Sequence, residues 1–177
     1  MTDKEIYGLL EERYGSLNAL DMGVYQRSFV SGDPGSDRLR VKYFFRINDR
    51  RLVGHAWFGP GAEGPPGFAH GGSISAVLDE AMGAASWLNE QIAVAARLTI
   101  EFKEMIPLDT QTILEAWVES IERRKVSIRA TLSSFDGKIY AEGDGLFITV
   151  SMDRFDNRDG ELPSPPEIIK STLKMQE

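Results

Sequence analysis

The residues that could do chemistry concentrate in one stretch of the chain, residues 64–83, which reads GPPGFAHGGSISAVLDEAMG. His70, Gly71 and Gly72 stand where a helical pattern begins, and an acid, Asp79, follows about two turns later. The first backbone N–H groups of a helix have no partner within it, and the helix dipole makes this end positive. Because glycine has no Cβ, a ligand oxygen can approach this backbone closely. The stretch therefore suggests an oxyanion or anion site beside a candidate nucleophile or general base.

A purely structural interpretation accounts for the same residues. In it, His70 bonds a carbonyl within a tight loop, and Asp79 is an ordinary exposed helix carboxylate. The spacing adds a further constraint, because Asp79 lies seven residues after Gly72, about 10 Å along a helix axis. An oxyanion donor and a base must each come within about 3 Å of one reacting carbonyl. One helix hardly supplies both groups, whereas two antiparallel helices in a two-fold dimer do, so we expect a site shared between subunits.

The helix that carries these groups is expected over residues 72–88, with two different faces. One face is an apolar stripe at i, i+3, i+4 spacing, and the other is almost entirely small apart from Asp79. The pattern predicts that a sheet covers the apolar stripe while another element approaches the small face. Glu80 projects in a different direction and is expected to be solvated. The apolar stripe comprises Ile74, Val77, Leu78, Ala81, Ala85 and Leu88, and the small face comprises Gly72, Ser75, Ala76, Asp79, Gly83 and Ser86.

The remaining elements are mostly strands joined by short turns. A helix is expected over residues 2–13, and turn signals such as Asp136-Gly137 separate the strand-like runs. The chain of 177 residues fits one domain, with an N-terminal helical segment over residues 1–20 and an irregular tail over 152–177. This order predicts an α+β fold with a largely antiparallel sheet. The expected strands are 24–31, 38–47, 51–59, 93–103, 110–122, 125–135 and 139–150.

Composition excludes several classes of protein. A formal net charge of −7 argues against nucleic-acid binding, which depends on neutralising phosphates with Lys and Arg. The chain has no cysteine and only two histidines, and no metal-ligand spacing, so neither a metal nor a cofactor is expected. No stretch approaches the roughly 18 apolar residues of a membrane helix, and the N-terminus does not read as an export signal. We therefore expect no membrane partner and a cytoplasmic location.

Three segments together resemble the hotdog-fold thioesterases of the PaaI-like type. They are residues 64–83, then ARLTIEFKEMIPLD, and finally AEGDGLFITV. The GPPG sequence before HGG is especially similar to the mitochondrial acyl-CoA thioesterase branch. The resemblance implies a curved antiparallel sheet wrapped around one long central helix, and a homodimer that in some relatives pairs into a dimer of dimers. It also implies hydrolysis of an acyl thioester, carried by coenzyme A or an acyl-carrier protein, without a metal.

The resemblance also implies roles for individual residues. The Gly71 backbone would polarise the thioester carbonyl, with Gly72 beside it, and His70 would support the loop. Asp79 would act from the other subunit, as the nucleophile or as the general base for water.

The strand after the helix departs from the family pattern. Ala95 stands where several relatives carry a Thr thought to position the water. Strict alternation places Ala95, Arg97 and Thr99 on one face, nearer the site, where Arg97 would suit a carboxylate or phosphate of the substrate. The same alternation turns the other side chains of the strand toward the core, namely Leu98, Ile100 and Phe102.

Two other features have both a functional and a structural interpretation. The basic run Arg123, Arg124 and Lys125 at a predicted hairpin would meet the phosphates of coenzyme A, or would simply be solvated. His55, on a strand among apolar neighbours, is expected to be a core or interface histidine rather than a catalyst.

Three functions remain open from the sequence. The leading one is an acyl-thioester hydrolase. The second is a related biosynthetic enzyme that adds a nucleophile to an unsaturated acyl thioester. Ala95 and Arg97 are the residues that suggest this function. The third is a non-catalytic acyl-CoA binder, against which the joint presence of the glycine loop and Asp79 counts.

Overall fold

The computed structural model describes residues 2–20, 28–31, 33 and 35–151 of the chain. The expected irregular tail, residues 152–177, lies outside the described residues, as do residues 24–27 of the first expected strand. The described remainder of that strand, residues 28–31, begins a turn, so this part of the prediction is wrong. The described residues include no helix that is long and apolar enough to cross a membrane.

The elements otherwise follow the predicted order closely. The helix predicted for residues 72–88 begins one residue earlier, and each of the six later strands lies within three residues of its expected bounds. In chain order they are α1 (Asp3–Tyr14), β1 (Asn18–Ala19), β2 (Leu39–Arg46), β3 (Arg51–Phe58), a 3₁₀ turn η2 (Pro60–Ala62), α2 (Gly71–Leu88), β4 (Ala93–Phe102), β5 (Thr110–Glu122), β6 (Lys125–Ser133) and β7 (Ile139–Thr149).

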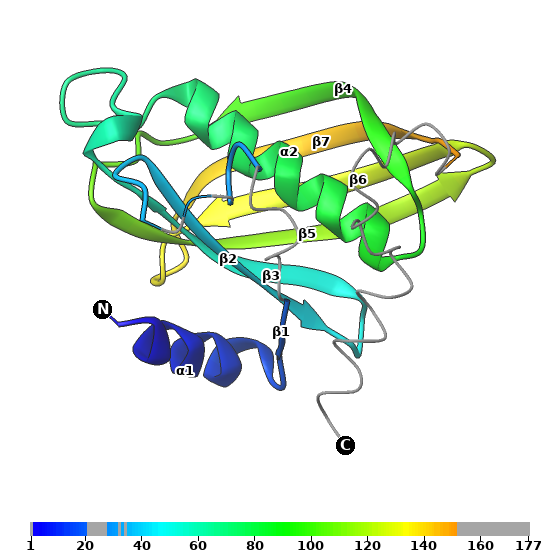
Figure 1. The fold of residues 1–177 in the computed structure, drawn as a ribbon, viewed down its shortest axis with the longest axis horizontal. Helices are drawn as coiled ribbons and strands as arrows, with labels where there is room; N and C mark the ends of the chain where they lie inside the picture. Colours follow the sequence, from blue (N-terminus) through cyan, green and yellow to red (C-terminus); the bar gives the residue numbers. More distant parts are fainter. Residues whose placement is uncertain (1, 21–27, 32, 34, 152–177) are drawn as a thin grey trace.

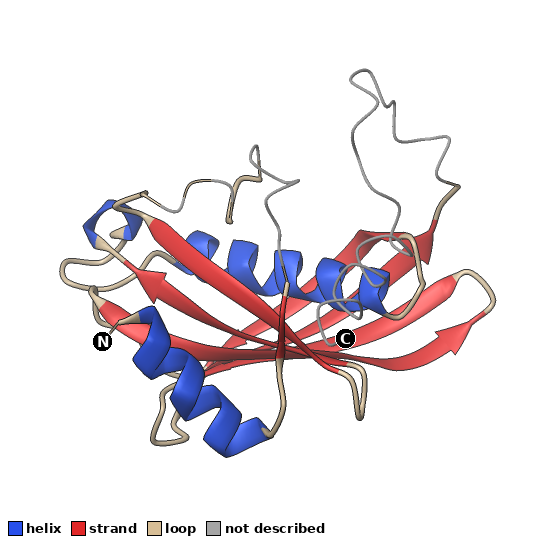
Figure 2. Ribbon diagram, turned by 60° about the horizontal axis from the view of Figure 1, so that its bottom comes forward, coloured by secondary structure: helices blue, strands red, loops and turns tan. Residues whose placement is uncertain are grey.

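One antiparallel sheet contains every strand in the order β1-β2-β3-β5-β6-β7-β4. The chain leaves β3, forms α2 along the sheet and returns as β4, so β4 pairs with β7 and becomes an edge strand. Figures 1 and 2 show α2 lying along one face of the curved sheet and α1 on the opposite face. The predicted α+β architecture, a curved antiparallel sheet around one long helix with an N-terminal helix, is confirmed.

The main core lies between α2 and the sheet. The helix buries its apolar stripe against the inward-facing residues of the strands, and two glycines of β7, Gly143 and Gly145, allow the helix side chains to approach closely. A Cβ on Gly143, for example, would meet Ile100 at 3.1 Å and Met82 at 3.4 Å. This dense packing fixes the rotation of α2 about its axis and so fixes which of its residues remain accessible. The fully buried helix residues are Val77, Leu78, Ala81, Met82, Ala85 and Ser86.

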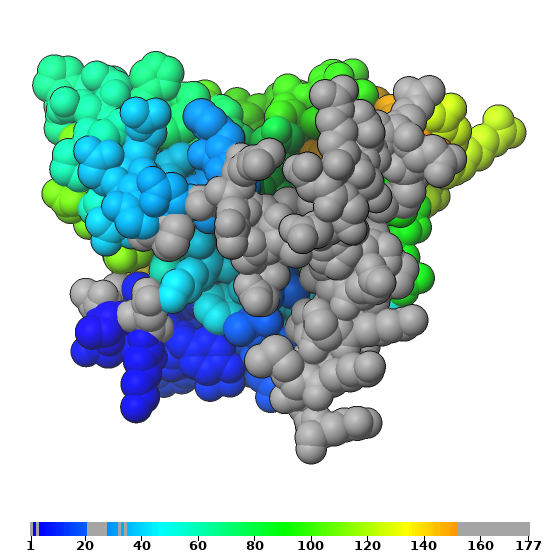
Figure 3. Space-filling view, viewed as in Figure 1, coloured from blue at the N-terminus to red at the C-terminus, as the bar shows by residue number. Residues whose placement is uncertain are grey.

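The helix α1 forms a second, smaller core on the outer face of the sheet. Ile6 and Leu10 pack there with Val53 and Ile113, and Tyr14 Oη donates a 2.7 Å hydrogen bond to Glu115. The space-filling view shows α1, in dark blue, at the lower margin of the molecule (Figure 3). Because α1 lies on the face opposite α2, it stabilises the sheet without covering the helix that carries the candidate site.

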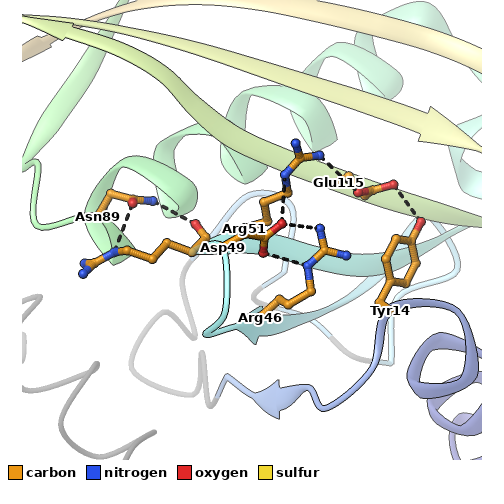
Figure 4. Close-up of polar contacts among 7 residues, drawn as sticks. Tyr14, Arg46, Asp49, Arg51, Asn89 and Glu115 are labelled. Atoms are coloured by element: carbon orange, nitrogen blue, oxygen red, sulfur yellow. Dashed lines mark hydrogen bonds and ion pairs between the residues drawn. The ribbon is translucent and has the colours of Figure 1, made fainter.

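A polar network connects the turn between β2 and β3 to the C-terminal end of α2. Arg50 donates to the Leu88 carbonyl at 3.0 Å, and the Asn89 side chain donates to the Arg50 carbonyl at 3.0 Å (Figure 4). In the same turn Asp49 forms ion pairs with Arg46 and Arg51. These contacts hold the last turn of α2 against the sheet, so both ends of the helix are fixed.

The close packing of β7 against α2 can be tested with one substitution, Gly145→Ala. A Cβ there would lie 2.6 Å from Phe147 Cε2 and 2.9 Å from Met82 Sδ. We expect the free energy of unfolding to fall by about 1–3 kcal/mol in urea denaturation, because overpacking forces neighbouring side chains out of position.

The matched control is Gly8→Ala in α1, where a Cβ would meet no atom within 4 Å. This change should raise the free energy of unfolding by up to about 1 kcal/mol, since alanine is the better helix former. A Gly145→Ala protein as stable as wild type would contradict the packing described here.

Candidate active site

The loop before α2 is built around backbone positions that require glycine. Gly64 passes directly against His70, and a Cβ on Gly64 would lie 2.7 Å from the His70 Cα. Gly67 has a φ of 80°, which glycine adopts without strain, and its N–H donates to Glu63 at 2.8 Å. The Ala69 N–H donates to the Ile106 carbonyl at 2.9 Å and so ties the loop to the segment after β4. The glycines and prolines thus fix where α2 begins.

His70 caps the first turn of α2. Its backbone is extended, and its Nδ1 accepts a 2.8 Å hydrogen bond from the Gly72 N–H. Its own N–H donates to the Ala62 carbonyl at 2.7 Å. In the neutral imidazole an accepting Nδ1 leaves the proton on Nε2. His70 therefore supports the loop as predicted, but it does so by using the Gly72 N–H, which is then not offered to a ligand.

Gly71 supplies the donor that remains at this helix end. Its N–H donates no hydrogen bond within the part of the chain that the structure describes, and the residue is half-buried. Two residues after Gly71, Ser73 directs both its N–H and its hydroxyl to the His70 carbonyl. Of the two glycines proposed from the sequence, Gly71 is the one whose N–H can donate a hydrogen bond to a ligand oxygen.

Asp79 lies in the middle of α2, on the same side as Gly71 and Ser75, because residues four apart share a helix face. It is half-buried and forms no hydrogen bond or ion pair with another described residue. Burial raises the pKa of this carboxyl, and the negative charge of Glu80 raises the pKa further. A desolvated carboxylate without a hydrogen-bond donor is a stronger base and nucleophile than a solvated one.

Glu80 does not behave as predicted. Instead of being solvated, it accepts a 2.9 Å hydrogen bond from Tyr43 Oη and another from Ser28 Oγ. Tyr43 is buried in β2, and burial raises its pKa well above the ordinary value, so it remains a neutral donor. Glu80 thus ties α2 to the sheet and to residue 28, directly beside Asp79.

Gly71 and Asp79 do not meet within one subunit. Both belong to the continuous helix α2, and eight residues of helix separate them by about 12 Å along its axis. No single carbonyl group can contact both, so the separation predicted from the sequence is retained in the structure.

The strand β4 contains an irregularity that the alternation argument did not foresee. Its register with β7 shifts between Ala95 and Arg97, so Ala95 pairs with Phe147 whereas Arg97 pairs with Leu146. Phe147 belongs to the core under α2. Because paired residues lie on the same face, Ala95 faces α2, while Arg97 and Thr99 lie on the outer face. The prediction that these three residues share a face near the site is wrong.

Phe102 was predicted to face the core, and its exposure to solvent differs from that prediction. Its pairing with Ala141 places it on the α2 face of the sheet, but its side chain is 54% exposed. The ring lies next to Gly71, with Cζ 3.3 Å from the position a Gly71 Cβ would occupy. Sequence reasoning missed this residue, although a large apolar side chain at the end of an edge strand was a signal for it.

The basic hairpin and His55 lie away from these groups. Arg123, Arg124 and Lys125 are exposed at the turn between β5 and β6, beyond the C-terminal end of α2 and not near Gly71 (Figure 1). Arg124 donates there to the Thr149 carbonyl at 3.1 Å. His55 is buried and pairs with Ile113, which belongs to the core under α1 on the opposite face. Among the described residues, no cluster of His, Asp or Glu has the composition of a metal site.

Comparison with known proteins gives a consistent result. Residues 66–141 match the family model of the thioesterase superfamily. Acyl-coenzyme A thioesterase THEM5 of Mus musculus is 33% identical over 111 residues, which is 62% of this chain and 45% of the relative. Acyl-coenzyme A thioesterase THEM4 of Xenopus laevis is 38% identical over 106 residues, 59% of this chain and 48% of the relative. The chain thus spans about half the length of these relatives.

Solved structures share the fold. A thioesterase superfamily protein is 25% identical with a TM-score of 0.64, covering 82% of this chain and 74% of that one. The PaaI protein of E. coli is 16% identical with a TM-score of 0.58, covering 63% of this chain and 80% of that one. Both support the architecture described above.

The environment of Asp79 leads to a testable titration. By NMR, the Asp79 carboxyl should titrate above an ordinary aspartate, because burial disfavours its charged form. The folded state then binds this proton more tightly than the unfolded state does. The contribution of Asp79 to the free energy of unfolding should therefore decrease as the pH rises through its pKa.

Glu80→Gln should lower the Asp79 pKa relative to wild type, since it removes the neighbouring charge while its amide keeps an oxygen that accepts from Tyr43 and offers an N–H to the Ser28 hydroxyl. Glu142→Gln, on the outer face of β7 beside Lys103, is the control and should leave it unchanged. An Asp79 that titrates at or below the ordinary aspartate value would contradict this description.

Proposed function

We propose that the chain is a member of the thioesterase superfamily and that it hydrolyses acyl-coenzyme A thioesters at a site shared between two subunits. One observation carries the proposal. A free N–H at Gly71 and a desolvated carboxylate at Asp79 share one side of α2, yet lie about 12 Å apart. Acyl transfer needs both kinds of group within reach of one carbonyl.

The chemistry follows from what each group can do. The Gly71 N–H, at the positive end of the helix dipole, donates to the thioester oxygen and stabilises the negative charge that develops there. Asp79 of the partner subunit removes a proton from a water molecule whose oxygen bonds to the carbonyl carbon. The carbon–sulfur bond then breaks, and the proton passes to the departing thiolate. Direct attack by Asp79, followed by hydrolysis of the mixed anhydride, gives the same products.

The sheet offers a surface for the second subunit. β4 is a ten-residue edge strand, and its Val94 is 43% exposed. Long edge strands with exposed apolar residues are templates for pairing with another strand. Pairing of two β4 strands about a two-fold axis would bring the small N-terminal parts of the two α2 helices together.

The substrate class is supported by the relatives. Two of the curated proteins that this chain resembles, THEM5 of Mus musculus and THEM4 of Xenopus laevis, are named acyl-coenzyme A thioesterases. A thioester bound to an acyl-carrier protein would present the same carbonyl and the same thiolate leaving group to Gly71 and Asp79.

Asp79→Asn tests the role of the carboxylate. It retains the size of the side chain but removes both the nucleophile and the base. Hydrolysis of acyl-CoA, followed by thiol release, should fall by about 10²–10⁴-fold. The melting temperature should be unchanged or slightly higher, because a desolvated charge is removed from the folded state.

The matched control is Asp144→Asn on the outer face of β7, where the exposed carboxylate pairs with Arg129. This variant should retain wild-type activity. A folded Asp79→Asn protein that hydrolyses its best substrate at the wild-type rate would contradict the mechanism. If it also bound acyl-CoA normally, the binder function would lead.

Ser75→Cys tests the arrangement of the two helices. A two-fold axis that places Gly71 opposite Asp79 of the partner subunit also places Ser75 opposite its own copy. Helices packed about 8–10 Å apart bring such residues within the distance a disulfide spans, about 4.4–6.8 Å between Cα atoms. Since the natural chain has no cysteine, mild oxidation should yield one product, a disulfide-linked dimer.

The control is Ser73→Cys, about 200° away around the same helix, which should remain uncross-linked. Sedimentation of the wild type should show a species at least twice the chain mass of 19.7 kDa. A folded 19.7 kDa monomer at micromolar concentration would overturn the shared site.

A further inference from the structure

The ring of Phe102 is exposed to solvent, so packing in the hydrophobic core does not explain an aromatic residue at this position. It is the last residue of β4, and more than half of its side chain is open to solvent. Three ring atoms lie 3.3, 3.5 and 3.9 Å from the position of a Gly71 Cβ, so the tip of the ring is directed at the Gly71 backbone. A carbonyl oxygen bound by the Gly71 N–H would bring its attached carbon atoms into contact with this ring.

Among the described residues of β4, the face that carries Phe102 has no cation. Every β4 residue on the α2 face is uncharged, and the cations of this region lie elsewhere. Arg97 is on the outer face, and Lys103 is paired with Glu101 and, at 3.1 Å, with Glu142, both of which are on the outer face. The carboxylate of Asp79 adds a negative charge to the proposed site. The residues on the α2 face are Ala93, Ala95, Leu98, Ile100 and Phe102.

Two buried side chains of α2, Leu78 and Met82, occupy the interior beneath the C-terminal half of β4. Both are fully buried and contact the backbone of β7 at Gly143. An acyl group that leaves Gly71 along the surface would meet the Phe102 ring, an exposed apolar group adjacent to the donor.

We propose that Phe102 determines the acyl specificity of this site, and that it selects thioesters whose acyl group is uncharged and apolar over those that carry a carboxylate. The inference rests on the proposed thioesterase function. It replaces the expectation that Arg97 would favour carboxylate-bearing substrates, because Arg97 lies on the other face of the sheet.

The test compares hydrolysis of hexanoyl-CoA and succinyl-CoA by the full-length protein. Wild type should have the higher kcat/KM for hexanoyl-CoA. Phe102→Ala should lower that value by about tenfold, the scale on which apolar pockets discriminate, and should change succinyl-CoA turnover much less. Phe102→Leu, which keeps an apolar side chain, should retain most of the preference.

The control is Leu9→Ala, an exposed apolar residue of α1 on the opposite face of the sheet, which should leave the ratio of the two kcat/KM values unchanged. Sedimentation of each variant shows whether it remains a dimer, and therefore whether Phe102 contacts the substrate or the partner subunit. If Phe102→Ala dissociates the dimer, Phe102 acts in assembly and the inference is overturned.

A binding measurement keeps this inference distinct from the proposed function. The probe is a ketone analogue of hexanoyl-CoA in which a methylene separates the sulfur from the carbonyl, so that it cannot be hydrolysed. If wild type lacks hydrolase activity but binds the probe about tenfold more tightly than Phe102→Ala does, the function fails and the specificity role stands. If wild type hydrolyses hexanoyl-CoA and Phe102→Ala keeps the same substrate ratio, the function stands and the specificity role is overturned. Wild type that neither hydrolyses hexanoyl-CoA nor binds the probe would overturn both.

Discussion

The continuity of α2 is the constraint on which the proposed shared site depends. A regular helix fixes the separation of Gly71 and Asp79 at about 12 Å along its axis, and it places both on one side. The N–H of Gly71 is free because the first turn of a helix has no internal acceptor for it, whereas His70 satisfies the Gly72 N–H. A second copy of the helix, running in the opposite direction, supplies each missing partner. Oligomerisation in this account is therefore part of the chemistry.

The rest of the molecule holds α2 in one position and one rotation. Fully buried side chains such as Leu78 and Met82 pack against the glycines of β7. Glu80 accepts a hydrogen bond from Tyr43 in β2, which lies near the other end of the strand order. The contacts of Arg50 and Asn89 fix the last turn, and the loop from Gly64 to His70 fixes the first. Because α1 lies on the other face of the sheet, it covers neither α2 nor the edge strand β4.

Hydrophobic periodicity and turn residues were sufficient to predict α1, α2 and six strands, because those signals are local. The chain segment from residue 64 to 83 also indicated the donor and the acid, since the glycine loop and the helix spacing need no tertiary information. The β4 bulge was not predictable, because one extra residue in a strand depends on its pairing with β7 and reverses every later side chain. Ala95 was assigned to the wrong face for that reason. Arg97 and Phe102 lie on the faces that alternation assigns to them, but Arg97 is not near the site, and Phe102, at an open edge, is exposed. Glu80 was misassigned because its donors, Tyr43 and Ser28, are distant in the sequence.

The shared site is tested most directly by mixing two defects. Gly71→Pro removes the donor N–H at a helix position that accepts proline, after a His70 backbone that is already extended. Asp79→Asn removes the acid, and each variant alone should be inactive as a homodimer. A purified heterodimer of the two has one site with both defects and one intact site, so it should recover about half of the wild-type activity per dimer. A heterodimer as inactive as its two parents would show that Gly71 and Asp79 do not act together across the subunits.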